Sequence, residues 1–103
     1  MRIAVAQTRP VKGNIPVNIG QHKKYIERAV SHGADLVVFP ELSLTGYEPS
    51  LAHDLATTAG DSRFDDFQAI SDERNISIVV GMPIRVAEGT RIGLIIFQPN
   101  QPR

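Results

Sequence analysis

The chain has 103 residues, and its 11 basic and 11 acidic side chains give a formal net charge of zero at pH 7. A chain of this length forms one domain at most, and its scattered basic residues predict no nucleic-acid or membrane partner. It contains no cysteine, which excludes a disulfide, a cysteine nucleophile and a cysteine metal site within these residues. The apolar run at residues 3–6 is too short for a signal-peptide core or a membrane span, so we expect a cytoplasmic α/β protein.

The first part of the chain predicts a strand followed by a helix. Residues 2–8 carry an apolar run typical of a strand that is covered on both faces. A loop at residues 9–14 leads to a helix over residues 16–32, in which Pro16 suits the first turn and Gly33 suits the left-handed stop. The apolar stripe of this helix consists of Ile19, Ile26, Ala29 and Val30.

The second part continues this alternation. A strand is predicted at residues 34–39, followed by a polar loop up to Asp61, which caps a helix that ends near residue 75. Residues 76–84 and 91–98 then form the two strands of a hairpin. The order β-α-β-α-β-β predicts an α/β layered fold around a central sheet, without an internal repeat or an interdomain linker.

At the end of the second strand, an apolar run leads through a proline into an acid. Phe39 precedes Pro40 and is therefore held extended, and Pro40 has no N–H for a ladder, so pairing should end there. Glu41 is thereby displayed at the carboxyl edge of the sheet, where open α/β sheets bind ligands. An acid beside apolar strand residues is partly desolvated, which favours a general base, whereas a solvated loop acid or a helix cap is the simpler alternative.

The segment after Glu41 is predicted to be a polar loop that can line a pocket, through Ser43, Thr45, Gly46 and Tyr47. Gly46 is suited to such a loop because glycine adopts backbone angles that are closed to other residues.

The histidines give no evidence of a metal site. His22, His32 and His53 lack metal-ligand spacing, and we expect neither a metal nor another cofactor. His53 and Asp54 could form a dyad, but an exposed polar turn is the favoured interpretation. Gly81, inside the third predicted strand, indicates either a close backbone approach or a strand irregularity.

The segment GADLVVFPELSLTGY resembles the glutamate motif of the nitrilase, or carbon–nitrogen hydrolase, superfamily. The opening RIAVAQTRPVKGNIPVNI and the later ISIVVGMPIR stand in that family's order and spacing, so the resemblance covers residues 2–97. It implies a four-layer α-β-β-α sandwich and a Glu–Lys–Cys triad that cleaves the C–N bond of a small amide or nitrile. In that mechanism the cysteine attacks the substrate carbon, the glutamate is the general base, and the lysine stabilises the developing charge. Glu41 matches the family's glutamate, and Tyr47 falls where its motif tyrosine lines the pocket, although a half-buried loop aromatic is an equal alternative.

The chain departs from the family at the other two members of the triad. The lysine should follow the glutamate, but Lys12, Lys23 and Lys24 all precede it, and there is no cysteine. Ser43 cannot take over as nucleophile, because it lies beside Glu41 rather than on a separate strand end. The 103 residues therefore look like the N-terminal portion of a single hydrolase domain, an amidase more than a nitrilase, and we expect this portion to be inactive alone.

Two other interpretations stay open. A degenerate half-domain could be a non-catalytic interaction module that pairs with a partner chain and completes its sheets. A flavodoxin-like nucleotide or phosphate binder is weaker, because QTRPVKGN stands where a glycine-rich phosphate loop would follow the first strand.

The resemblance also predicts that this chain associates with other molecules. With half of the family's domain, one face of the sheet should lack its cover, so we expect a homo-oligomer or association with the missing half. The apolar strand residues expected to take part are Val5, Val37, Phe39, Ile78, Val80, Leu94 and Ile96.

Overall fold

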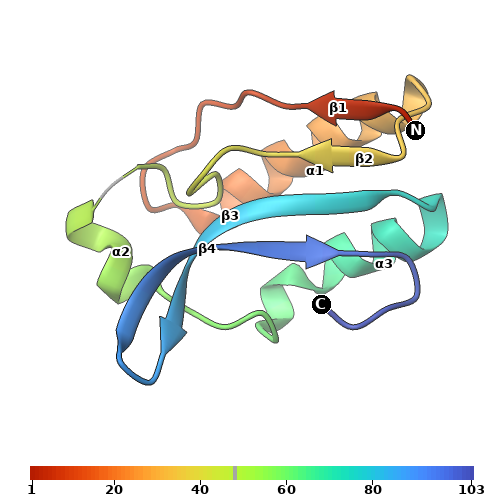
Figure 1. Ribbon diagram of the computed structural model, residues 1–103. Helices are drawn as coiled ribbons and strands as arrows, with labels where there is room; N and C mark the ends of the chain where they lie inside the picture. Colours follow the sequence, from red (N-terminus) through yellow and green to blue (C-terminus); the bar gives the residue numbers. More distant parts are fainter. Residues whose placement is uncertain (48) are drawn as a thin grey trace.

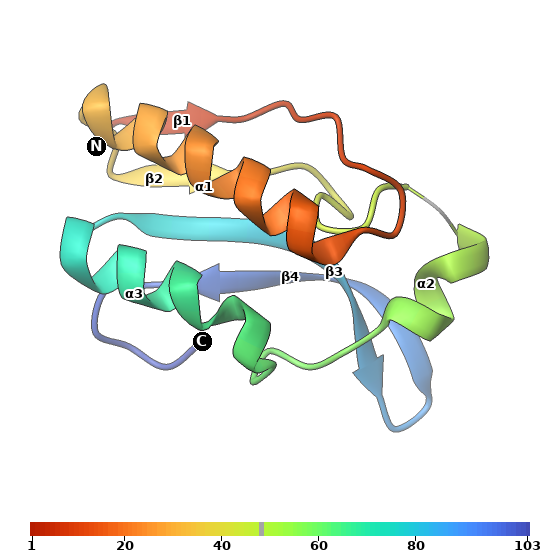
Figure 2. The same ribbon diagram turned by 180° about the vertical axis from the view of Figure 1, so that it is seen from behind.

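A computed structural model describes residues 1–47 and 49–103 as one four-stranded sheet with helices on one face (Figures 1 and 2). The strands are β1 (Ile3–Val5), β2 (Leu36–Val38), β3 (Ser77–Val86) and β4 (Gly89–Phe97). The helices are α1 (Ile15–Ser31), α2 (Pro49–Leu55) and α3 (Asp65–Arg74), and a 3-10 turn at Ser62–Phe64 precedes α3. The predicted α/β fold with a central sheet is confirmed.

The order of the strands explains why the helices share one face. The sheet runs β1-β2-β3-β4, with the first three strands parallel and β4 antiparallel to β3. Parallel strands need crossover connections, and these are almost always right-handed. Since both crossovers step across the sheet in the same direction, α1 and α3 lie on the same side of it (Figure 2).

Most predicted elements are present with shifted ends, and one helix was missed. The helix expected at residues 16–32 runs over Ile15–Ser31, and the strand expected at residues 2–8 is shorter and runs over Ile3–Val5. The hairpin of β3 and β4 is confirmed. The loop expected before Asp61 contains α2, which has seven residues and is too short to display a helical period in the sequence. His53 therefore lies in a helix and not in the predicted polar turn.

Residues at the helix ends account for where the helices begin and end. The side chain of Asn14 accepts a hydrogen bond from a backbone N–H in the first turn of α1, and Pro16 occupies that turn. Gly33 follows α1 with a φ of 76°, and Asn75 ends α3 with a φ of 53°. Asp61 was predicted to cap the long helix, but its carboxylate accepts a backbone N–H of the 3-10 turn instead.

The hydrophobic core lies between the sheet and the two helices that cover it. Ile78 and Val80 of β3, with Ile95 and Phe97 of β4, project into this space and are buried. Phe67 of α3 meets Phe97 with ring centroids 5.5 Å apart, a spacing at which aromatic rings attract each other. These contacts hold α3 against the β3–β4 hairpin.

The opposite face of the sheet is apolar and, among the described residues, no helix covers it (Figure 1). Val5 is 82% exposed and Leu94 is 58% exposed. We name this surface the open face. Its exposed large apolar side chains are Ile3, Val5, Ile92, Leu94 and Ile96.

The sheet has the uncovered face that was expected, but several of the residues predicted to lie on it lie on the opposite face. Strand neighbours project to opposite faces, so residues one apart cannot both belong to the same face. Val5, Leu94 and Ile96 lie on the open face as predicted. The others face the helices and are buried: Val37, Phe39, Ile78 and Val80.

We predict that the open face makes the 103-residue chain self-associate. Each large apolar side chain left in water forgoes about 1.5–3 kcal/mol, against a total domain stability of about 5–15 kcal/mol. Leu94→Thr should weaken association, whereas Val17→Thr, which removes an exposed apolar side chain from α1, should not. Sedimentation velocity over a dilution series measures this. A dilute monomer that melts cooperatively and binds no hydrophobic dye would contradict the prediction.

Candidate active site after the second strand

β1 and β2 are parallel and end at the same edge of the sheet (Figure 1). Glu41 stands three residues after the last residue of β2, at this edge. Pairing with β3 extends to Phe39, whose N–H donates to a β3 carbonyl at 2.9 Å, and then stops at Pro40 as predicted. The next backbone bond to β3 is made by Leu44, whose N–H donates to the Gly81 carbonyl at 3.0 Å. Residues 40–46, named the Glu41 loop here, therefore arch across β3 between these two bonds.

Gly81 is the point where this loop touches β3. A Cβ atom on Gly81 would lie 2.4 Å from the backbone nitrogen of Leu42 and 2.5 Å from the carbonyl oxygen of Pro40. Both atoms belong to the backbone and cannot swing aside, so the arch requires glycine at this position. The close approach predicted as one of two alternatives for Gly81 is confirmed.

Within the Glu41 loop, the backbone bonds to itself. The N–H of Ser43 donates to the Pro40 carbonyl at 3.1 Å, and the N–H of Gly46 donates to the Leu42 carbonyl at 2.8 Å. Leu42 has a φ of 54° and Gly46 a φ of 82°, so two left-handed residues turn the chain within five positions. The conformational role predicted for Gly46 is confirmed.

The polar side chains of the loop point inward, which corrects their predicted role as a pocket lining. Ser43 and Thr45 are both buried. The Ser43 Oγ lies 2.9 Å from Nε2 of His22 on α1 and accepts the Gly81 N–H at 3.0 Å. The Thr45 hydroxyl donates to the Gly46 carbonyl at 3.0 Å. Buried hydroxyls need such partners, and here the partners are internal.

Asn18, one helical turn before His22, holds the same loop from α1. Its side-chain amide donates to the carbonyls of Leu44 at 2.9 Å and Val11 at 2.8 Å, and its carbonyl oxygen accepts the Val11 N–H at 2.7 Å. Asn18 is fully buried. It thereby ties the Glu41 loop, the segment after β1 and α1 together.

His22 is a buried titratable group that sequence reasoning missed. It is 1% exposed, stacks on Phe39 with ring centroids 4.1 Å apart, and lies 6.1 Å from the ring of Phe67. Burial lowers the pKa of His22 from 6.5 to about 4. A hydrogen bond to the backbone carbonyl of Asn18 acts in the opposite direction and raises the pKa, but its effect is smaller. A signal was present in the sequence, because His22 stands three residues after Ile19 and four before Ile26, inside the apolar stripe of α1.

The two predicted site residues lie at opposite ends of the loop segment and are exposed. The desolvation expected for Glu41 is absent, because its side chain is exposed in the described part of the chain. Tyr47 is 72% exposed and follows the last residue of the Glu41 loop. The half-buried alternative for Tyr47 is therefore wrong, and its pocket role stays a prediction.

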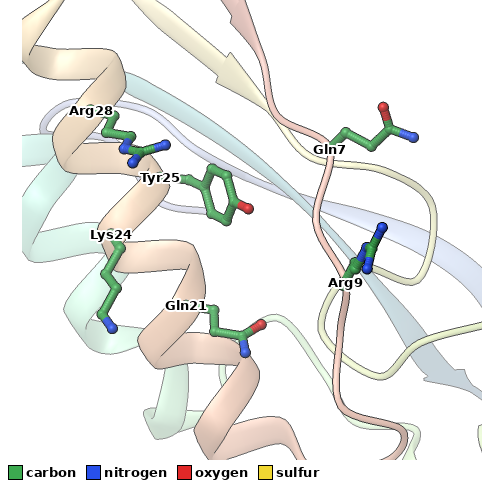
Figure 3. A pocket seen from close by; sticks show the side chains of 6 residues that line it. All are labelled: Gln7, Arg9, Gln21, Lys24, Tyr25 and Arg28. Carbon is green, nitrogen blue, oxygen red and sulfur yellow. The ribbon is translucent and has the colours of Figure 1, made fainter.

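A cavity of about 510 Å³ lies elsewhere, between α1 and the segment after β1 (Figure 3). Neither Glu41 nor Tyr47 lines it. Three of its side chains are cationic, and they come from both walls of the cavity (Figure 3). The lining residues are Gln7, Arg9, Gln21, Lys24, Tyr25 and Arg28.

The described residues contain no group of three His, Cys, Asp or Glu side chains placed to hold a metal ion. Over the same part of the chain, no helix has the length and apolar character needed to span a membrane.

The profile of the carbon–nitrogen hydrolase family matches residues 2–100, which is nearly all of the chain. The chain belongs to the carbon–nitrogen hydrolase family. The resemblance seen in its glutamate motif is thereby confirmed.

Individual members of this family are similar over only part of their own length. A glutamine-dependent NAD(+) synthetase from Acinetobacter baylyi is 35% identical over 92 residues, which cover 87% of this chain and 16% of the synthetase. An aliphatic nitrilase from Rhodococcus rhodochrous is 28% identical over 97 residues, covering 79% of this chain and 25% of the nitrilase. An amidase structure from Nesterenkonia sp. superimposes with a TM-score of 0.75 at 28% identity, covering 93% of this chain and 37% of the amidase.

The contact at Gly81 yields a stability prediction with a matched control. Gly81→Ala should lower the free energy of unfolding by at least about 1–3 kcal/mol, the usual cost of overpacking, because backbone atoms of the Glu41 loop block the new methyl group. Gly20→Ala in α1 meets nothing within 4 Å and should instead raise it by about 0.5–1 kcal/mol. Urea unfolding of both variants measures this, and equal effects would contradict the clash.

The buried His22 predicts a specific loss of stability in acid. Its pKa in the folded state, about 4, lies below the unfolded value of 6.5, so the unfolded chain binds the proton more tightly. Its contribution is fully present above pH 6.5 and is lost as the pH falls towards 4, to a total of about 3 kcal/mol.

Urea unfolding at several pH values between 4 and 7 tests this prediction. His22→Phe keeps an aromatic ring on Phe39 but cannot titrate, so it should lack this part of the pH dependence. Parallel pH profiles for the natural chain and His22→Phe would show that His22 does not contribute.

Proposed function

We propose that this chain supplies the general base of an enzyme that hydrolyses a small amide, with Glu41 as that base. In the reaction, water is added across the C–N bond, and the products are a carboxylic acid and ammonia or an amine. Glu41 would accept the proton of a cysteine thiol during attack on the carbonyl carbon and pass it to the departing ammonia or amine. It would then accept the proton of water during release of the acid and return it to the cysteine. The cysteine and the charge-stabilising lysine would come from outside these 103 residues.

The observation that carries this proposal is the construction of the Glu41 loop. A flexible loop would not hold a carboxylate to the tolerance that proton transfer requires. Here the loop is bonded to itself, rests on Gly81, and is tied to α1 through Asn18. Glu41 belongs to this hydrogen-bonded loop but is itself exposed, so its carboxylate is accessible.

An amide is favoured over a nitrile as substrate because of what is known of the relatives. A single-residue mutant of the Nesterenkonia amidase, 28% identical to this chain, has been seen in complex with butyramide. A variant of it, 27% identical, shows covalent addition of the acetamide moiety of fluoroacetamide at its active-site cysteine. The Acinetobacter synthetase depends on glutamine, whose side chain ends in a primary amide. Because the chain is also similar to nitrilases, hydrolysis of a nitrile should be tested alongside hydrolysis of the amide.

A second candidate function follows from the open face. The chain could be a non-catalytic half-domain whose sheet is completed by a partner chain. The observation that favours it is an apolar surface with five large side chains exposed, which is more than scattered exposure in a monomer explains. A partner that places a second sheet with its own helices over this face would also produce the α-β-β-α arrangement of the family.

The test of the proposal is the loss of hydrolysis in Glu41→Gln, measured in the whole encoded protein. Ammonia release from butyramide and from butyronitrile should fall by about 10²–10⁴-fold, the usual contribution of a general base. Glu88→Gln, at an exposed acid in the turn between β3 and β4, should leave the rate unchanged. A Glu41→Gln protein with full activity would rule out the proposed base.

The 103-residue chain alone should show no hydrolysis above its own Glu41→Gln variant. A base without a nucleophile contributes little to the reaction. Turnover by the isolated chain that disappears in Glu41→Gln would reveal a nucleophile within these residues and would contradict this expectation.

A further inference from the structure

The contact between His22 and Ser43 is a buried interaction of a titratable group with the Glu41 loop, and the proposed reaction does not use it. His22 projects from α1, twenty-one residues before Ser43 in the chain, and reaches the loop two residues after Glu41. Both side chains are almost completely buried. The ring is surrounded by Asn18 of its own helix, Phe39 after β2 and Phe67 of α3, none of which carries a charge.

The partners fix the direction of each hydrogen bond in this contact. The backbone carbonyl oxygen of Asn18 lies 2.7 Å from Nδ1 of His22 and can only accept a hydrogen bond, so Nδ1 carries the proton. The Gly81 N–H can only donate, so it occupies one lone pair of the Ser43 oxygen. The Ser43 hydroxyl proton is then free to be donated to Nε2 of His22, which is 2.9 Å away and unprotonated.

This chain of bonds joins three elements through one oxygen atom. Proceeding from β3, the Gly81 N–H donates to Ser43, Ser43 donates to His22, and His22 donates to the Asn18 carbonyl in α1. At Ser43, the Glu41 loop is therefore hydrogen-bonded to both α1 and β3. Rotation of the Ser43 side chain would break its bonds to Gly81 and His22 and leave these buried groups unpaired. An unpaired buried group costs more free energy than a lost contact at the surface.

We propose that His22 is a positioning residue for Glu41, holding the turn that carries this carboxylate in place through the Ser43 hydroxyl. His22 does not touch the reacting atoms in this proposal. Its importance for rate rests on the proposed function of Glu41, whereas its effect on the position of Glu41 does not. The neutral ring needed as acceptor is supported independently by its burial.

Packing alone is the competing explanation, and it makes a different prediction. His22 stacks on Phe39, so any aromatic ring at this position would satisfy a packing role. His22→Phe keeps the ring and removes both hydrogen bonds. Ser43→Ala removes the hydroxyl and leaves the ring. Both variants remove the Ser43–His22 bond, so both must displace Glu41 if this bond positions it, whereas packing alone predicts no effect of His22→Phe.

The first part of the experiment reads the geometry by NMR in the whole encoded protein, labelled with ¹⁵N-histidine, ¹⁵N-glycine and ¹³C-glutamate. We expect Nδ1 of His22 to be protonated and Nε2 unprotonated at neutral pH. The Gly81 amide should shift in His22→Phe, although the two residues are joined only through Ser43. The Glu41 carboxyl signal should move or broaden in both variants.

The second part measures kcat and KM for amide hydrolysis in the same proteins. Both variants should lose about 10–100-fold in kcat, as expected for a displaced catalytic group, with less than a twofold change in KM. The double variant should lose no more than Ser43→Ala, because both single variants remove the Ser43–His22 bond. Ser71→Ala is the control, since Ser71 is equally buried and bonds the Phe97 carbonyl at 3.4 Å, on the α3 side of the core. It should retain kcat.

The two parts separate failure of this proposal from failure of the proposed function. If the protein hydrolyses no amide but the Gly81 and Glu41 signals move as expected, the positioning role stands and the proposed reaction is wrong. If those signals stay in place, or if His22→Phe keeps kcat while Ser43→Ala loses it, His22 does not position Glu41. A His22 ring protonated on Nε2 at neutral pH would overturn the proposal as well.

Discussion

The structure around the candidate site depends on one close contact, between the backbone of the Glu41 loop and the bare Cα of Gly81. At that point the Leu42 nitrogen and the Pro40 carbonyl lie where a side chain on β3 would have to be. Because of this contact, the loop can pass directly over β3. Because the loop crosses β3 at this point, the Ser43 side chain lies between the loop and the core, where it contacts both the Gly81 N–H and His22. Any larger residue at position 81 would separate these groups at once.

The conformation of Leu42 shows how this arch is stabilised despite its strain. A left-handed backbone costs a residue other than glycine about 1–2 kcal/mol. Full burial of a leucine side chain contributes about 1.5–3 kcal/mol, so leucine at this position recovers the cost by packing. Leu42 is indeed buried, with a φ of 54°. A loop whose strained residue is held by the core cannot relax without exposing that residue, which favours a single conformation for Glu41.

Much of the fold could be predicted from the sequence, because its strands and long helices have strong local signals. The glutamate motif placed Glu41 at the correct sheet edge, and Pro40 marked the end of pairing. The inward orientation of Ser43 could not be predicted, because a serine in a loop gives no sign of which partners tertiary packing will bring to it. Helix α2 has too few residues to show a period. The faces of β2 and β3 were misassigned because both strands read as continuous apolar runs, without the alternation that distinguishes a covered face from an exposed one.

The open face and the exposure of Glu41 have a common physical consequence. A general base works well only where water is partly excluded, and the described residues leave this carboxylate exposed. They also leave the apolar side of the sheet without a layer. Any chain that covers this face gains apolar burial, and a layer that extends to the nearby sheet edge would surround the Glu41 loop as well. Such a layer would complete the sandwich and desolvate Glu41 in one step, around a loop whose backbone is already held by hydrogen bonds.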